Sequence, residues 1–324
     1  MGRVPIVATL QRVPGGMMLI PLLLGSIVRT FWPGFLGLGS FTTALFRDGA
    51  LPLIALLILG TGAQINVQQS GRVLAKTGVL LLAKTVVPAL LVIGYGFAFG
   101  REGVLGVSLL AAMVAFINSN GGLWLALASQ YGDEEDRGAY IASALNDGPF
   151  FTLVFLGLSG LGAIPLVYIV AAIVPFLIGF VLGNLDSRFA EMMKPTAAIT
   201  VPFFAFALGA GIDLRSLAVG GLTGLWLGLL VSLVTGALGY WAYRRILGER
   251  SAVGFAIGTT AGNSVATPAV VAQADASFGP YVAVATAQVA AAVLVTAVVT
   301  PLITHYLHRR LHRGEVAQPA GAGS

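Results

Sequence analysis

Long apolar runs separated by short polar connections occupy most of the chain. About twenty consecutive apolar residues cross the hydrocarbon layer of a bilayer as one helix, so runs of this length predict membrane-spanning helices. Ten spans are predicted, at residues 15–32, 49–66, 73–99, 104–131, 137–160, 164–184, 196–213, 218–245, 251–275 and 279–307. Because the connections are short, the pattern predicts an all-α polytopic membrane protein without a soluble module.

Two of the predicted spans are interrupted near their middles by polar, glycine-rich peptide. The fourth contains Asn118-Ser119-Asn120-Gly121-Gly122, and the ninth contains Asn263-Ser264-Val265-Ala266-Thr267-Pro268. Lipid cannot hydrogen-bond freed amides or carbonyls, so such breaks persist only where they line a cavity or are buried in protein. A matched pair of broken helices points to the binding site of a secondary transporter.

The two halves of the chain resemble each other in the order of these features. The matching pieces are Pro21–Gly25 with Pro175–Gly179, Gly62–Asn66 with Gly209–Asp213, and Asn120 and Gln130 with Asn263 and Gln273. Five spans per half is an odd number, so the second half enters the membrane from the opposite side, which predicts a 5+5 inverted repeat. The predicted units are 1–162 and 163–312, followed by a disordered cytoplasmic tail at 313–324.

Composition and charge agree with this class of protein. The chain is 57% hydrophobic and 10% charged, and the absence of cysteine excludes disulfides and thiolate metal sites. Thirteen Lys and Arg residues fall on one side of the predicted spans, four fall on the other, and Lys84 falls inside a span. The positive-inside rule therefore predicts cytoplasmic termini. The basic residues are dispersed over loops and tails, so they do not form a nucleic-acid-binding patch.

The breaks carry the candidate substrate-binding residues. These are Asn118, Ser119, Asn120, Gly121, Gly122, Asn263, Ser264 and Thr267. The start of a half-helix favours a carboxylate, while amide and hydroxyl side chains can hydrogen-bond sugar-like hydroxyls. The alternative is that these residues only hold helices together.

Two ionisable residues inside apolar runs are candidates for proton coupling. Asp147 lies in Asn146-Asp147-Gly148-Pro149 within the fifth span, and Lys84 lies within the third. An ionisable group at membrane depth is costly, and it suggests function by default. Lys84 could pair with a carboxylate, offset the negative ends of the half-helices or attract an anionic substrate. The alternatives are an interfacial Asp147 and a Lys84 that reaches the membrane interface.

Other charged groups favour ordinary roles. The acidic run Asp133–Asp136 predicts a solvated loop before the fifth span. His305, His308 and His312 share a helix face, but their arginine neighbours favour a membrane-interface anchor over a metal site. The pattern therefore predicts neither a metal nor a cofactor.

The chain resembles the bacterial 2-keto-3-deoxygluconate permease family from near Val13 to about Arg309. The segments that carry the resemblance are Val13–Leu19, Gly39–Thr42, Asn120–Leu123, Gly183–Asp186, Pro202–Gly209 with Ile212–Leu214, and Val265–Pro268. The resemblance implies a proton-coupled importer of 2-keto-3-deoxy-D-gluconate in the bacterial inner membrane. It also implies the fold of bile-acid sodium symporters, in which spans 1, 2, 6 and 7 form a panel and spans 3–5 and 8–10 form a core. In that fold the broken fourth and ninth spans cross, and transport proceeds by alternating access of an elevator-like kind.

The resemblance also bears on the coupling ion. The acid of the fifth span corresponds in place to Asp147, although relatives can carry glutamate there. Bile-acid relatives bind sodium with an acid in the ninth span, and this sequence has none between Ser251 and Ala274. That difference favours protons over sodium.

Two other functions stay open at this point. One is a sodium-coupled symporter of another small organic anion. The other is a membrane-embedded enzyme, which is disfavoured because no Ser/His pair, histidine-rich metal motif or carboxylate dyad lies inside the spans. The expected partners are an anionic sugar acid and the lipid bilayer, and the sequence does not indicate an oligomeric state.

Overall fold

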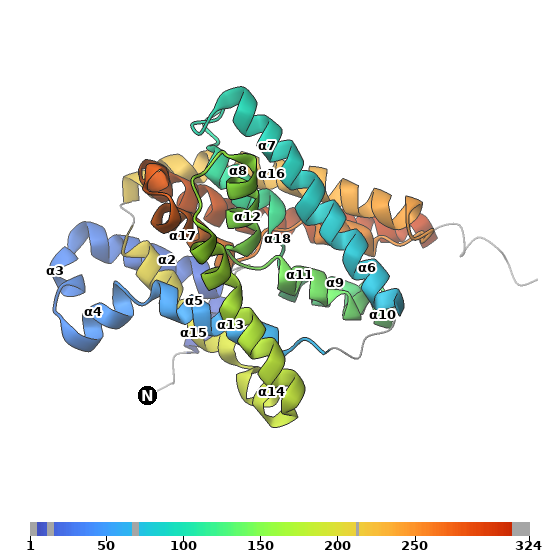
Figure 1. Cartoon of the computed structure of the whole chain (residues 1–324), viewed down its shortest axis with the longest axis horizontal. Helices are drawn as coiled ribbons and strands as arrows, with labels where there is room; N and C mark the ends of the chain where they lie inside the picture. Colours follow the sequence, from blue (N-terminus) through green and yellow to red (C-terminus); the bar gives the residue numbers. More distant parts are fainter. Residues whose placement is uncertain (1–4, 12–15, 67–70, 212–213, 313–324) are drawn as a thin grey trace, which may run out of the picture.

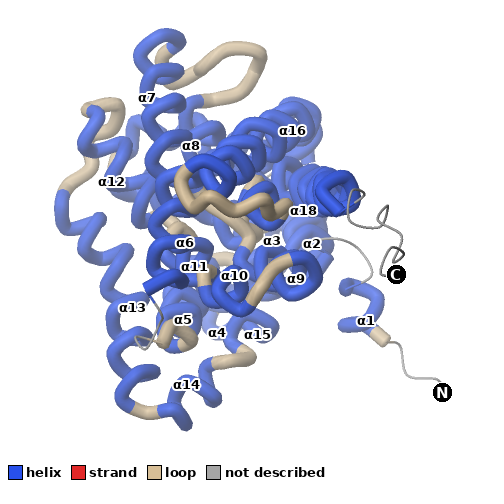
Figure 2. Tube along the Cα trace, turned by 90° about the vertical axis from the view of Figure 1, so that its right-hand side faces the viewer, coloured by secondary structure: helices blue, strands red, loops and turns tan. Residues whose placement is uncertain are grey.

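The structure, a computed structural model, describes residues 5–11, 16–66, 71–211 and 214–312, so the predicted tail 313–324 and Asp213 lie outside it. Within these ranges the ordered elements are helices and no strand is formed (Figure 2). In chain order they are α1 (Ile6–Gln11), α2 (Gly16–Phe31), α3 (Pro33–Leu36), α4 (Ser40–Phe46), α5 (Ala50–Ala63), α6 (Gly71–Leu81), the π-helix η1 (Leu82–Val86), α7 (Val87–Phe99), α8 (Leu109–Ile117), α9 (Gly121–Tyr131), α10 (Glu134–Gly138), α11 (Tyr140–Leu145), α12 (Phe150–Ser159), α13 (Leu166–Leu185), α14 (Ser187–Met193), α15 (Thr196–Gly209), α16 (Leu214–Arg245), the 3₁₀ helices η2 (Val253–Ile257) and η3 (Asn263–Ala266), α17 (Thr267–Ala274), the 3₁₀ helix η4 (Ala276–Tyr281) and α18 (Val282–His312).

The described helices confirm a polytopic membrane protein. By length and composition the described residues form six helical segments that can cross a membrane, several of them made of consecutive labelled helices, or up to eight if each of two bent pairs counts as one span. The other predicted spans consist of shorter pieces. α2 has 16 residues, and the predicted ninth span is divided into η2, η3 and the 8-residue α17.

The helices form two groups. In the first, α2 packs on α15, and α5 packs on both α13 and α15. In the second, α16 and α18 run side by side, and α8 lies against α7 and α18 (Figure 1). The first group thus joins helices from the two halves of the chain, and in the second group α8 of the first half packs on α18 of the second.

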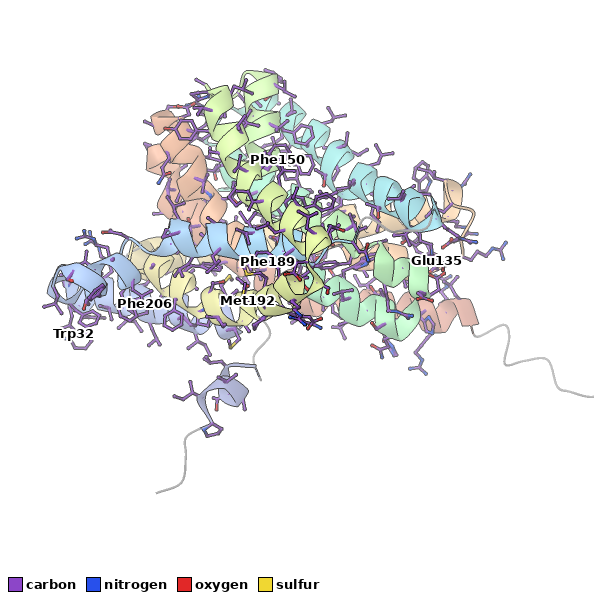
Figure 3. All side chains as sticks on the ribbon, turned by 60° about the horizontal axis from the view of Figure 1, so that its bottom comes forward. Trp32, Glu135, Phe150, Phe189, Met192 and Phe206 are labelled. Carbon is purple, nitrogen blue, oxygen red and sulfur yellow. The ribbon has the colours of Figure 1, made fainter. Side chains whose placement is uncertain are left out.

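The surface of the bundle is apolar where lipid is expected. Leu166 and Leu185 at the ends of α13 are 73% and 78% exposed, and Trp32 beside α3 is 65% exposed. Figure 3 shows Trp32 at one end of the molecule and Glu135 toward the other. Exposed apolar side chains of this density suit a hydrocarbon solvent rather than water.

Helix α8 lies at the centre of the second group. All of its side chains are buried except that of Phe116, which is half-buried. A helix that is apolar all round belongs inside a protein, so the break after α8 lies deep in the fold.

Glycines allow two close helix crossings in the first group. An added Cβ at Gly209 of α15 would lie 2.0 Å from the carbonyl oxygen of Leu22 in α2, and one at Gly179 of α13 would lie 1.9 Å from that of Leu59 in α5. Small residues let helix backbones approach in this way in membrane proteins.

Candidate functional site

The first break separates α8 from α9 by three residues. The last carbonyls of a helix lack partners within it. Here side chains supply the donors: Asn118 Nδ2 to Val114 O at 2.8 Å, Thr260 Oγ1 to Ala115 O at 3.1 Å, and Thr85 Oγ1 to Ile117 O at 3.2 Å. The break is thus stabilised by hydroxyls from η1 and from the second break.

The start of α9 is capped by its own asparagine. The Oδ1 atom of Asn120 accepts a hydrogen bond from the amide of Leu123 at 3.0 Å. At Gly121 a Cβ would lie 2.5 Å from the ring of Tyr140, so a larger residue would force the half-helix away from α11. Gly122 is exposed, so the first turn of α9 is accessible.

The second break runs from Gly258 to Gly262, between η2 and η3. Two threonines one turn apart on α18 support it: Thr300 Oγ1 donates to Gly258 O at 2.6 Å, and Thr260 N donates to Thr296 Oγ1 at 3.1 Å. Ser264 and Thr267, which follow the break, are fully buried or nearly so.

The two breaks contact each other directly. The amide of Asn120 donates to Thr259 Oγ1 at 2.9 Å, and Thr260 Oγ1 donates to Ala115 O. Segments about 140 residues apart in the chain therefore meet at the middle of the second helix group.

Asp147 lies next to the two breaks, in a third interruption between α11 and α12. Helices α11 and α12 are bent by 57° across residues 146–149, where Gly148 has a φ of +97° that favours glycine. The Asp147 carboxyl lies close enough to the Asn263 side chain, at the start of η3, to interact with it. Its neighbour Asn146 accepts hydrogen bonds from Ser119 N and Ser119 Oγ at 3.1 and 2.9 Å.

Several polar atoms at this junction have no hydrogen-bond partner. Four buried atoms of predicted site residues share this property: Asn118 Oδ1, Asp147 Oδ1, Ser264 Oγ and Thr267 Oγ1. Unsatisfied buried polar atoms are rare in folded proteins and call for an explanation. A polar ligand with hydroxyls and a carboxylate would satisfy groups of this kind.

Lys84 lies beside the last turn of α8, at the first break. It belongs to η1, its side chain is fully buried, and its Nζ atom lies 3.2 Å from Thr235 Oγ1 and 3.5 Å from Ala115 O. Among the described residues the ion pairs do not include Lys84, and its contacts are with a hydroxyl and a helix carbonyl.

The structure thus brings the predicted residues together around one junction, while their roles in binding stay predictions. Sequence reasoning missed several residues that hold the junction: Thr85, Ser143, Asn146, Thr296 and Thr300. Their only local signal is a polar side chain within an apolar run.

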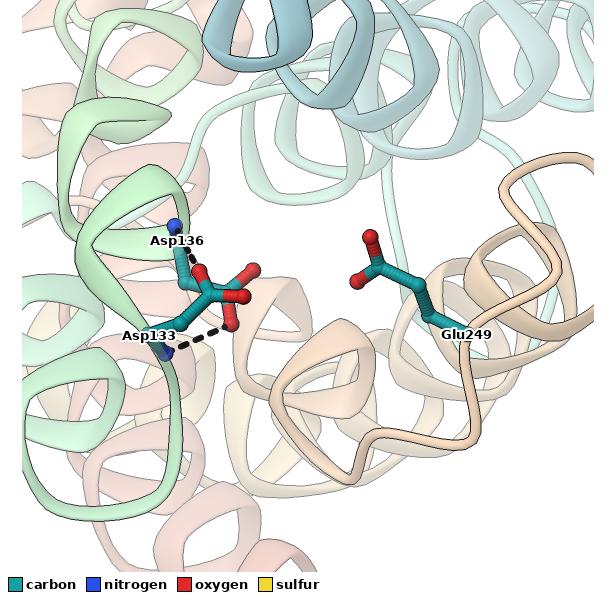
Figure 4. A group of neighbouring side chains, drawn as sticks. All are labelled: Asp133, Asp136 and Glu249. Carbon is teal, nitrogen blue, oxygen red and sulfur yellow. Dashed lines mark hydrogen bonds between the residues drawn. The ribbon is translucent and has the colours of Figure 1, made fainter.

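The acidic run at 133–136 is not simply a solvated loop. Asp136 is 2% exposed, and its Oδ1 atom lies 2.8 Å from Nζ of the fully buried Lys76, which also contacts Asp133 and Glu249 at 3.0 and 3.1 Å. Figure 4 shows the reciprocal hydrogen bonds of Asp133 and Asp136, with Glu249 facing them from another loop. The three carboxylates are close enough to hold a metal ion, but the Lys76 ammonium already contacts all three.

We expect Lys76→Met to destabilise the fold by about 3–5 kcal/mol, because Asp136 would remain buried without its cation. Burial acts to raise the pKa of Asp133, but hydrogen bonds from the Asp136 amide and from Lys76 outweigh it and hold this pKa below its ordinary value. That stabilisation is present above about pH 4 and is lost as the pH falls through the lowered pKa. Thermal unfolding in detergent at pH 7 and below pH 4 checks the effect.

The matched control for this prediction is Lys194→Met, at a lysine whose side chain is 66% exposed. An exposed ion pair contributes about 0–1 kcal/mol, so the control should unfold near the wild-type temperature. Equal unfolding temperatures for the two variants would contradict the importance of the Lys76 group.

The C-terminal histidines contact an aromatic ring. The Nδ1 atom of His305 is hydrogen-bonded to the Tyr131 hydroxyl at 2.9 Å, and the rings of His308 and Tyr131 are 4.8 Å apart. The side chain of His312 lies outside the described set. These contacts attach α18 to the end of α9.

The chain is similar to known permeases over nearly its whole length. The family model of the 2-keto-3-deoxygluconate permease matches residues 7–313. The 2-keto-3-deoxygluconate permease 1 of Salmonella typhimurium is 44% identical over 285 residues, which cover 88% of this chain and 90% of the relative. The 2-keto-3-deoxygluconate permease of Xanthomonas euvesicatoria pv. vesicatoria is 41% identical over 294 residues, which cover 89% of this chain and 92% of the relative. The permease of Escherichia coli O139:H28 is 38% identical over 293 residues, which cover 89% of each chain. By these matches the chain belongs to the 2-keto-3-deoxygluconate permease family, a family of transporters and not of enzymes.

Proposed function

We propose that this protein imports 2-keto-3-deoxy-D-gluconate together with protons across the bacterial inner membrane, with both termini in the cytoplasm. The single observation that carries the proposal is the meeting of the two broken helices beside Asp147, with unpartnered polar atoms on both. The relatives named as permeases for this sugar acid support the choice of substrate.

The substrate would bind at the junction of the breaks. Its carboxylate would be placed near the accessible first turn of α9, where Gly122 is exposed and the helix dipole favours an anion. Its hydroxyls would contact the residues of the breaks that the sequence singles out. Those residues are Asn118, Ser119, Asn120, Gly121, Gly122, Asn263, Ser264 and Thr267. Asn118, Ser264 and Thr267 have free acceptor or hydroxyl atoms for such contacts.

Asp147 would carry the proton. It is the acid of the junction: its carboxyl lies near the Asn263 side chain, and its Oδ1 atom is buried without a partner. Since no acid occurs between Ser251 and Ala274, a sodium site of the kind implied for bile-acid relatives lacks its carboxylate.

A ten-span, 5+5 inverted repeat is part of the proposal. Gly25 and Gly179 occupy matching positions of the two predicted repeats, as do Gly62 and Gly209. In the fold Gly25 packs against the backbone of Phe206–Ala210 around Gly209, and Gly62 packs against the backbone of Phe176–Phe180 around Gly179. Replacing each glycine by its counterpart turns the Gly25–Gly209 contact into the Gly179–Gly62 contact, as a pseudo-two-fold axis requires.

Alternating access would move the second helix group, the core, against the first group, the panel of α2, α5, α13 and α15. A cleft of about 360 Å³ lies between them, lined on the panel side by Phe176 and Phe180 and on the core side by Leu74, Ile141 and Leu145. The two sides of the cleft come from different helix groups, so sliding of one group on the other would change the shape of the cleft. This geometry supports an elevator-like mechanism, in which the core carries the junction.

Uptake into proteoliposomes tests the proposal. Labelled 2-keto-3-deoxygluconate should accumulate inside vesicles when an inward proton gradient is imposed, and an inward sodium gradient alone should leave it at the level of passive equilibration. Accumulation that follows sodium and not pH would select the sodium-coupled alternative. Absence of accumulation under either gradient would refute transport of this substrate.

A further inference from the structure

Helices α16 and α18 run parallel, so their last turns lie at the same end of the molecule (Figure 1). The contacts between them advance together along both helices. An added Cβ at Gly228 would lie 2.8 Å from Ala292, and the hydroxyls of Ser232 and Thr300 are 2.9 Å apart. Contacting residues are thus 64 to 68 positions apart in the chain. The same register places the last turn of α16 level with a turn about 65 residues further on, near the end of α18.

The two helices end with the same pattern of exposed side chains. On each helix an exposed aromatic residue is followed three and four positions later by two exposed arginines. These residues, here called the aromatic–arginine surface, are Trp241, Arg244 and Arg245 on α16 and Tyr306, Arg309 and Arg310 on α18. Positions i, i+3 and i+4 share one face of a helix, so each ring lies one turn from its two arginines on the same side. The second set follows the first by 65 residues, which agrees with the register, so the two sets lie at one level.

The four arginines of this surface have no carboxylate partner among the described residues. The ion pairs of that part of the chain involve other basic groups. Glu249, the acid that follows α16, is 3.0 Å from Arg72 and 3.1 Å from Lys76. A helix end favours its own cations, because its free carbonyls carry a partial negative charge. Two pairs of cations at one level repel each other, however, and a bound anion would remove that repulsion.

The partner that fits this surface is the head group of an anionic phospholipid. A guanidinium group binds phosphate oxygens with two parallel hydrogen bonds, and clustered basic residues at the ends of membrane helices attract anionic lipids. Trp241 and Tyr306 are 56% and 61% exposed, and such rings are preferred at the level where head groups meet acyl chains. A soluble phosphate ion would use the arginines but would leave both exposed rings without a role. The rings therefore favour a lipid.

We propose that the aromatic–arginine surface binds anionic phospholipid, with the arginines on the phosphate and the two rings beside the first part of the acyl chains. Neither the substrate nor the coupling ion of the proposed function enters this inference. Packed helices lie about 8–10 Å apart, so one or two head groups can span the ends of α16 and α18. The bound lipid would hold together the helix pair behind the second break, to which α18 contributes Thr296 and Thr300.

Thermal unfolding of the full chain in a neutral detergent tests the site. Phosphatidylglycerol should raise the unfolding temperature of the wild type more than the same amount of phosphatidylcholine, because a ligand that binds only the folded state stabilises it. The variant Arg244→Gln/Arg245→Gln/Arg309→Gln/Arg310→Gln should need at least about tenfold more phosphatidylglycerol for half of the effect. Inorganic phosphate at the same concentration should not stabilise the wild type.

The matched control removes four exposed basic residues that are dispersed over other elements. It is Arg29→Gln/Arg137→Gln/Arg188→Gln/Lys194→Gln. This control has the same net charge as the arginine variant, so it should respond to phosphatidylglycerol like the wild type. An equal loss of the response in both variants would mean that total charge, and not this surface, attracts the lipid, and would overturn the proposal.

A second readout uses the wild-type surface and does not depend on the folding of the arginine variant. Phosphatidylglycerol brominated on its acyl chains should quench tryptophan fluorescence more than brominated phosphatidylcholine, and Trp241→Phe should abolish the difference. Equal quenching of the wild type by the two lipids would overturn the proposal, and so would equal stabilisation by inorganic phosphate. A chain that binds phosphatidylglycerol here but fails to transport 2-keto-3-deoxygluconate would refute the proposed function and leave the lipid site standing.

Discussion

Accumulation of 2-keto-3-deoxygluconate by Asp147→Asn under an inward proton gradient should fall to the level of passive equilibration, while exchange of substrate across the membrane persists. An amide cannot take up and release a proton near neutral pH. The proton gradient therefore no longer drives net uptake in the variant. Exchange of bound for free substrate needs no change of protonation, so it should continue. Uptake under an inward proton gradient, measured beside counterflow, checks both halves of the prediction.

Asp48→Asn is the matched control, because the side chain of Asp48 is 58% exposed and pairs only with its neighbour Arg47 among the described contacts. It should transport like the wild type. Asp147→Glu keeps a carboxylate, so it should recover part of the net uptake. If Asp147→Asn accumulates substrate against a gradient at the normal rate, the assignment of the proton site is wrong.

Gly179→Ala should destabilise the protein by about 1–3 kcal/mol, because an added methyl group would lie 1.9 Å from Leu59 O of α5 and the two helices must separate. The same contact lies at one of the two crossings proposed to be related by the inverted repeat. The thermal unfolding temperature in detergent should therefore drop by roughly 2–10 °C.

Gly94→Ala is the corresponding control on α7. No atom lies within 4 Å of the added Cβ, so the substitution meets open space and should gain the better helix propensity of alanine. Its unfolding temperature should equal or exceed that of the wild type. A similar drop for the two variants would show that the α5–α13 crossing does not depend on a small residue.

The positions of the breaks were predictable because their signal is local. Polar and glycine residues inside apolar runs conflict with a continuous helix in lipid, and this conflict is visible at Asn118–Gly122 and near Asn263 without any tertiary information. The kink at Gly148-Pro149 and the apolar runs themselves follow from the same kind of signal. Fragmentation of the ninth span into short 3₁₀ and α-helical pieces was not apparent, because single turns have no periodicity of their own.

The partners of charged groups were much less predictable. The sequence predicts a solvated loop for Asp136, yet Asp136 and Lys76 are buried in one ion-pair group with Glu249, more than a hundred residues away from Asp136. Equally, the sequence leaves Lys84 with several environments, and the packing of η1 against α8 and α16 selects one of them.

By itself the sequence determined the membrane class, the permease family, the sites of the breaks and the presence of an acid and a lysine among apolar residues. These properties depend on composition and on neighbours in the chain. Only the tertiary structure decided that Asn120 contacts Thr259, that Asn146 beside Asp147 contacts Ser119, and that the Lys84 Nζ atom faces a helix carbonyl end. The physical reason is that each of these contacts joins different helices, and a hydrogen bond of about 3 Å exists only once the packing of whole helices has fixed both partners.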